Sequence, residues 1–127
     1  MRNFIIVSVL GLAACVEEPV NGRTTYLESC AACHGVSGAG DGPAARGLAT
    51  TPPDLTMLAA RNGGVFPTDD VMSIIDGLER APHFSAAMPE FGAGDLGETV
   101  IVENEGLGTP VPFKLLVLTE YLQSIQQ

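Results

Sequence analysis

The chain has 127 residues and a formal net charge of −9, from 6 basic and 15 acidic side chains. This length corresponds to one small domain, and the acidic balance makes nucleic acid and anionic lipid headgroups poor partners, because binding either needs a basic surface. With 15 Gly, 9 Pro and no Trp, a domain this small usually needs a disulfide, a metal or a cofactor to supplement its apolar core.

The N-terminus has the form of an export signal. A short positive region precedes an apolar run from Phe4 to Leu12, which is too short to span a bilayer because a spanning helix needs ~20 residues. Small residues then lead directly into Cys15, a pattern that resembles the lipobox of bacterial lipoproteins. The alternatives are an ordinary cleavage site beside an incidental cysteine, or an uncleaved anchor. We expect a signal peptide at 1–14, a lipidated Cys15 with a tether at 15–22, and a domain at 23–127.

Helical patterns begin directly after the tether. Residues 23–33 suit a short helix, and residues 35–53, which are rich in Gly and Pro, are expected to form a loop. Asp54 can cap a further helix that begins at Leu55 and stops at Gly63.

Two more helices are expected in the second half of the domain. Thr68 is the N-cap candidate of the first, and acids follow it in the first turn, where the helix dipole favours them. Residues 81–109 are irregular, apart from a short strand at 99–102. The last helix follows Pro112, which suits a first turn. Its apolar stripe consists of Leu115, Leu118, Tyr121, Leu122 and Ile125.

The chemistry is concentrated in the motif Cys30-Ala-Ala-Cys33-His34. When one helical turn separates two thiols, both can form thioether bonds to the two vinyl groups on one edge of a porphyrin. A His directly after the second Cys can then reach the iron. The motif therefore predicts one covalently bound haem c, with His34 as an axial ligand.

Two other chemistries use the same residue types. A dithiol–disulfide redox pair also needs Cys-x-x-Cys, but it usually lies in a thioredoxin-like alternation of strands and helices, which this sequence lacks. A structural zinc site needs four ligands, and beyond the motif the exported chain offers only His83 and Cys15. Haem is therefore the stronger interpretation.

With this motif the chain resembles the class I c-type cytochromes over most of residues 22–127. In that family a helix that carries Cys-x-x-Cys-His crosses a C-terminal helix, and a Gly and an aromatic residue meet a Leu and an aromatic residue. Gly22 and Tyr26 match the first pair, and Leu118 and Tyr121 match the second. The resemblance implies an all-α cytochrome c fold, in which three to five short helices and long loops surround one haem.

The resemblance also implies a partner for the ligating histidine. The family has a Gly-Pro soon after the motif, and the Pro carbonyl accepts the Nδ1 proton of the His. Gly42-Pro43 resembles this pair, so we expect the Pro43 carbonyl to accept a hydrogen bond from His34. Such a bond fixes the tautomer of the imidazole and raises its basicity.

Met88 is the candidate sixth ligand of the iron. It precedes Pro89, which favours an extended loop conformation, and the segment resembles the axial-methionine loop of the family. Met57 and Met72 fall within helical patterns and are interpreted as core residues. His83 lies in the same loop as Met88 and is a rival ligand, which would lower the potential because a thioether favours the reduced iron.

Filled axial positions leave no open site for a substrate, so the sequence predicts an electron carrier and not an enzyme. We expect redox proteins, such as an oxidase, a reductase or a dehydrogenase, as partners. The expected location is the periplasm, with lipidated Cys15 as the anchor to a bacterial membrane. A haem enzyme or gas sensor would need an open sixth position. An obligatory subunit of an oxidase or dehydrogenase would share the same residues, and a large exposed apolar patch would point to it.

Overall fold

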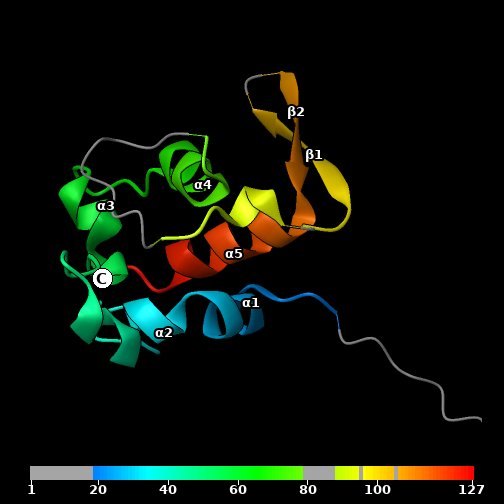
Figure 1. The fold of residues 1–127 in the computed structure, drawn as a ribbon. Helices are drawn as coiled ribbons and strands as arrows, with labels where there is room; N and C mark the ends of the chain where they lie inside the picture. The colour runs from blue at the N-terminus through cyan, green and yellow to red at the C-terminus, as the bar shows by residue number, and fades with distance from the viewer. Residues whose placement is uncertain (1–18, 79–87, 95, 105) are drawn as a thin grey trace, which may run out of the picture.

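The structure is a computed structural model, which describes residues 19–78, 88–94, 96–104 and 106–127. Within these residues short helices and loops dominate, and one small hairpin precedes the last helix (Figure 1). The elements are α1 (Gly22–Ser29), α2 (Ala31–His34), η1 (Pro43–Gly47), η2 (Leu55–Met57), α3 (Leu58–Arg61), α4 (Thr68–Asp76), η3 (Phe91–Ala93), β1 (Thr99–Asn104), β2 (Leu107–Pro112) and α5 (Phe113–Ser124), where η denotes a 3-10 helix. The predicted fold of short helices and long loops is confirmed, and the hairpin is an addition to it.

The helix expected at 23–33 forms as two helices that meet at Cys30. The first begins after Asn21, whose side chain accepts a hydrogen bond from the Thr24 amide at 3.0 Å. Gly35 ends the second with a φ of +79°, a left-handed conformation that favours glycine. The Cys-Ala-Ala-Cys-His motif therefore spans a helix junction and one helical turn.

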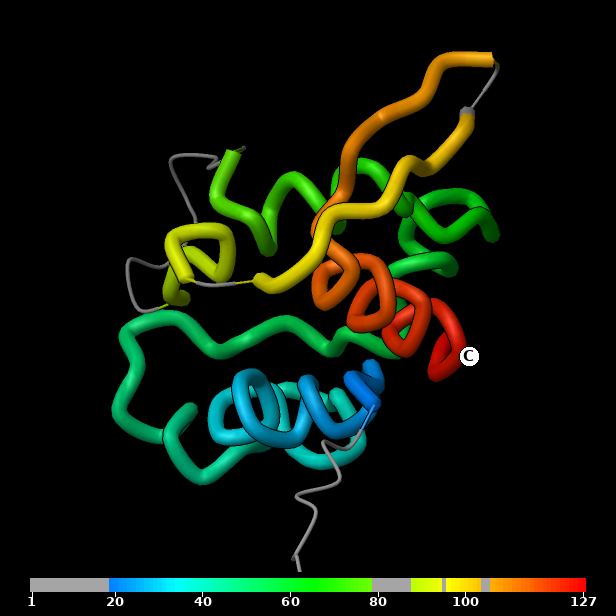
Figure 2. Tube along the Cα trace, turned by 90° about the vertical axis from the view of Figure 1, so that its right-hand side faces the viewer, coloured from blue at the N-terminus to red at the C-terminus, as the bar shows by residue number. Residues whose placement is uncertain are grey.

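Helix α1 crosses α5 at a point where no side chain separates them. A Cβ atom at Gly22 would overlap the carbonyl oxygen of Val117, so only glycine allows this approach. The rings of Tyr26 and Tyr121 pack with centroids 5.3 Å apart and planes tilted by 47°. Tyr26 and Leu118 are completely buried. The helix crossing expected from the resemblance is therefore confirmed (Figures 1 and 2).

The two central helices begin close to where the sequence predicts. Asp54 caps the first, because its carboxylate accepts a hydrogen bond from the Thr56 amide at 2.9 Å. That helix starts as the 3-10 turn η2, continues as α3 and ends before Gly63, as expected. In α4, Thr68 is the first helical residue and Pro67 is the N-cap, so the predicted cap lies one residue too late.

Helix α5 carries the apolar stripe that its sequence predicts. Leu115, Leu118 and Leu122 are buried, and Tyr121 and Ile125 pack against the same core. This core lies where α5 packs against α1 and α4. Among the described residues, no helix is long and apolar enough to cross a membrane.

The hairpin pairs β1 and β2 in antiparallel register, with Val100 opposite Val111, which is buried. The strand predicted at 99–102 is confirmed and extends to Asn104. The sequence does not predict β2, since two of its residues are prolines, which are rare inside sheets. The hairpin leads directly into α5, so it projects from the helical part of the molecule (Figure 1).

Candidate functional site

The two thiols and the imidazole of the motif line one cavity. Cys30 lies at the junction of α1 and α2, and Cys33 and His34 end the short α2. The amides of Cys33 and His34 both donate to the Cys30 carbonyl, at 3.1 and 2.9 Å, so a single turn brings the three residues together. Both cysteines are free thiols of intermediate exposure, and both line the cavity beside His34.

The cavity is apolar and has the size of a cofactor site. Its volume is about 430 Å³, within the ~300–1,000 Å³ of typical small-molecule and cofactor pockets. Residues of α1, α2, α3, α4 and α5 contribute to its wall, together with the loop that precedes η2. The aliphatic part of the wall includes Leu55, Leu58, Val71, Ile74, Ile75 and Leu122.

His34 presents an imidazole with one unpaired nitrogen. Burial lowers the pKa of His34, and the nearby Pro53 carbonyl opposes that shift. The Nδ1 atom is buried and has no hydrogen-bond partner. Buried polar atoms without a partner are rare in folded proteins. Because a neutral imidazole is the form that ligates a metal, these features fit a haem-ligating histidine.

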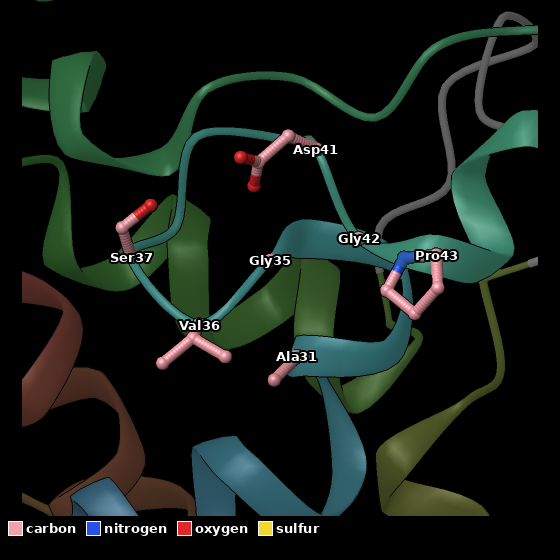
Figure 3. Close-up of a pocket in the computed structure, with 7 residues that line it drawn as sticks. All are labelled: Ala31, Gly35, Val36, Ser37, Asp41, Gly42 and Pro43. Atoms are coloured by element: carbon pink, nitrogen blue, oxygen red, sulfur yellow. The ribbon is translucent and has the colours of Figure 1, made fainter.

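His34 Nδ1, the atom expected to donate to the Pro43 carbonyl, has no hydrogen-bond partner in the structure. Pro43 is the first residue of η1, and the carbonyl groups of a 3-10 helix point along the helix, toward the amide three residues on. The Pro43 ring lines a separate hollow, formed by α2 and the loop that carries Val36 and Asp41 (Figure 3). It is Pro53, and not Pro43, that lines the cavity with His34.

The environment of the thiols argues against the two alternative chemistries. Burial, with Cys33 as the second cause, raises the pKa of Cys30 to about 11. A redox-active thiol needs a lowered pKa, because the thiolate is the nucleophile. A structural zinc site needs four ligands, and among the described residues no three His, Cys, Asp or Glu side chains are grouped to hold a metal ion. The described site therefore fits haem better than a disulfide or zinc.

Among the methionines that the structure describes, Met88 is the one that lines the cavity. Met57 is 37% exposed in η2, and Met72 lies on α4. Neither of these two methionines lines the cavity. The rival ligand His83 and the candidate lipidation site Cys15 lie outside the described residues. The structure thus brings Met88 to the same cavity as the motif.

Close packing supports the segment that follows Met88. A Cβ atom at Gly92 would overlap Asp76 at the end of α4, so η3 and α4 approach each other closely. The Lys114 ammonium of α5 lies 5.8 Å from the centroid of the Phe91 ring, a cation–π distance. Since Phe91 itself lines the cavity, α4 and α5 together hold this wall in place.

Tyr26 connects α1 to the residue that follows the motif. Its hydroxyl donates a buried hydrogen bond of 2.6 Å to the Gly35 carbonyl. Burial, followed by the influence of Cys30, Tyr121 and Asp41, raises the pKa of Tyr26 to about 12, so the hydroxyl keeps its proton at neutral pH. Sequence reasoning places Tyr26 at the helix crossing but misses this bond, since the spacing of the two residues does not indicate it.

Sequence reasoning also misses the cavity wall that precedes η2. Leu48, Thr50, Thr51 and Pro53 line the cavity from a stretch without periodicity. A backbone hydrogen bond of 2.7 Å from the Leu55 amide to the Gly38 carbonyl holds the end of this loop. The Pro pair at 52–53 indicates extended backbone from sequence alone, but it does not indicate which side the loop faces.

Comparison with known families identifies the class of protein that this fold and site define. A family model described as Cytochrome C oxidase, cbb3-type, subunit III matches residues 17–103, which include the motif and Met88. The chain belongs to this family. It is therefore a c-type cytochrome, an electron-transfer protein whose family implies covalently bound haem c. No match was found among the curated proteins or the solved structures compared.

The Tyr26 hydrogen bond gives a stability prediction. Tyr26→Phe removes the donor to the Gly35 carbonyl and keeps the ring, so the free energy of unfolding should fall by about 1 kcal/mol, the size of one net hydrogen bond. Guanidinium unfolding of the haem-loaded protein measures this difference. Tyr121→Phe is the matched control, because it keeps the ring contact of 5.3 Å between the two tyrosines. Equal losses in the two variants would show that the buried hydroxyl of Tyr26 has no special role.

Proposed function

We propose that the chain is a monohaem cytochrome that passes single electrons between redox proteins at the periplasmic side of a bacterial membrane. The observation that carries this proposal is that Cys30, Cys33, His34 and Met88 line one apolar cavity. In the proposed site the thiols of Cys30 and Cys33 would hold one haem through thioether bonds, and His34 and Met88 would ligate its iron. When bound, the haem supplies an iron that exchanges one electron at a time.

The residues of this chain suit that role in two ways. The half-buried imidazole of His34 suits ligation, because burial lowers its pKa and so favours the neutral form that binds a metal. The wall of the cavity is mainly apolar, with Leu55, Leu58 and Ile75 among its residues, so it would limit the access of water to a bound haem. An apolar surrounding of this kind tunes the potential of a bound haem.

Met88 decides between a carrier and an enzyme in this proposal. A thioether in the sixth position favours the reduced iron and therefore a higher potential. With both His34 and Met88 as ligands, the iron would keep no position for a substrate or a gas. The proposed protein is therefore a carrier and not a haem enzyme or sensor.

A second candidate is a subunit role within a terminal oxidase. The description of the matched family, subunit III of a cbb3-type cytochrome c oxidase, favours it. Both roles use the same residues, and the two differ in whether the chain stays attached to a larger complex. Purification from membranes in non-ionic detergent and high salt distinguishes them: a subunit stays with oxidase activity, whereas a free carrier separates from it.

The axial ligand can be tested by replacing Met88. Met88→His should keep six-coordination and lower the potential by well over ~59 mV, which is one tenfold change in a one-electron equilibrium. Met88→Ala should open the site, so that the ferrous protein binds carbon monoxide. Redox titration and visible spectra measure both effects. Met72→Leu is the matched control, because Met72 does not line the cavity, and its spectrum should be unchanged.

His83→Ala tests whether His83, and not Met88, is the sixth ligand of the iron. We expect it to leave the spectrum and the potential nearly unchanged. The assignment of Met88 fails if His83→Ala perturbs the iron while Met88→Ala does not. If the unaltered ferrous protein binds carbon monoxide readily at neutral pH, the sixth position is open, and a sensor or enzyme becomes the better hypothesis.

We also propose that Cys15 carries the lipid anchor. A diacylglyceryl group with an amide-linked chain holds a protein firmly at a membrane, whereas one acyl chain binds only marginally. The wild-type protein should therefore sediment with membranes, and Cys15→Ala should not be acylated. Mass spectrometry of the N-terminal peptide is the direct measurement. An unmodified Cys15 in the mature protein would refute lipidation while leaving the haem assignment untouched.

A further inference from the structure

The hydrogen bonds of the hairpin alternate in a way that defines its outer edge. The Phe113 amide donates to the Glu98 carbonyl at 2.7 Å, directly before the ladder begins. In an antiparallel ladder every second residue pair is hydrogen-bonded, and the register places Val100 and Val102 at the bonded positions. The residues between them therefore turn their N–H and C=O groups away from β2.

Proline closes the outer edge of β2. Pro110 and Pro112 lie opposite Ile101 and Thr99, at the positions whose nitrogen faces outward. Proline has no N–H to donate, and natural sheets use it to protect their edges. Only Gly108 keeps an outward-facing donor on this strand. The prolines of β2 are thus compatible with the hairpin and prevent a further strand from adding to that side.

Within the part of the chain that the structure describes, no other strand pairs with the outer edge of β1. Its outward-facing residues are Thr99, Ile101 and Glu103, all of them exposed, and Ile101 is 65% exposed. Among the described elements, β2 is the only one that packs extensively against β1, and the hairpin projects away from the helices (Figure 1). An open edge of this kind is a template for strand pairing. A two-stranded sheet is also marginally stable in water, whereas a sheet of more strands is more stable.

We propose that β1 pairs with β1 of a second copy of this chain, antiparallel and about a two-fold axis at Ile101. In this register Ile101 lies opposite Ile101 of the second copy, and Thr99 of each copy lies opposite Glu103 of the other. Each of these pairs can exchange two backbone hydrogen bonds. No like charges lie directly opposite each other, and the two isoleucines cover each other's apolar surface. The edge is therefore complementary to itself.

The closed edge of β2 limits the assembly to two copies. In the paired sheet both outer strands are β2, where Pro110 and Pro112 leave only the Gly108 amide as an outward-facing donor and so disfavour the addition of another strand. Such a two-fold interface is closed, so it forms a dimer and not a fibre. The net charge of −9 on each chain opposes association, so salt should strengthen the dimer by screening this repulsion.

Light scattering of the haem-loaded, full-length protein in non-ionic detergent tests the proposal. The protein mass should rise from one chain to two with protein concentration, and at lower concentration when sodium chloride is added. Ile101→Pro removes the central outward-facing N–H of β1. Pro110, on the opposite strand, lacks this donor in the same way. The substitution should raise the apparent dissociation constant at least about tenfold.

Two measurements separate loss of the edge from loss of the hairpin. Amide exchange at Val100 and Val102 should stay slow in Ile101→Pro, because their hydrogen bonds run to β2. Leu107→Thr is the matched control: it removes another exposed apolar side chain of the hairpin at a bonded ladder position, and it should leave the dissociation constant unchanged.

The proposal is overturned if the wild-type protein stays a single chain at every concentration and salt level. It is also overturned if Ile101→Pro associates as tightly as the wild type while keeping its hairpin. If the amides of Thr99, Ile101 and Glu103 become protected only when another redox protein is added, the edge serves a different partner and the second-copy interface is wrong.

Discussion

The position of the motif depends on how closely α1 approaches α5. Gly22 allows the α1 backbone to touch the Val117 carbonyl, and one turn later Tyr26 is completely buried against the same helix. The Tyr26 hydroxyl then reaches the Gly35 carbonyl at 2.6 Å, so the same side chain fixes both the crossing and the residue after His34. Because the motif lies between these two attachments, the thiols and the imidazole are directed into one cavity instead of solvent.

The cavity in turn depends on elements that are far apart in the sequence. The loop before η2 supplies one wall, and the segment with Met88 and Phe91 supplies another. The second is held by the approach of Gly92 to Asp76, where any side chain would overlap α4. This arrangement surrounds a nitrogen and sulfur donor set with apolar groups, which is the environment that a cytochrome needs to set its potential and exclude water.

Sequence reasoning succeeds where local chemistry determines the result. The stripe of α5, the cap at Asp54 and the Cys-Ala-Ala-Cys-His motif each depend on residues within a few turns of one another. It fails where long-range contacts decide. The loop that brings Pro53, and not Pro43, to the cavity has no periodicity, and the bond from Leu55 to Gly38 that orients it joins residues far apart in the sequence. The strand β2 is missed for a similar reason, since its prolines are acceptable only at outward-facing positions of a register that the sequence does not reveal.

The central claim is that Cys30 and Cys33 hold one haem covalently in this cavity. The most direct measurement is the intact mass of the protein after acid–acetone extraction, following expression with a cytochrome c maturation system. We predict that the extracted protein retains its haem and exceeds the mass of the processed polypeptide by one haem, apart from any lipid at Cys15. A polypeptide that loses all its haem in the extraction, with both thiols unmodified, would contradict the account.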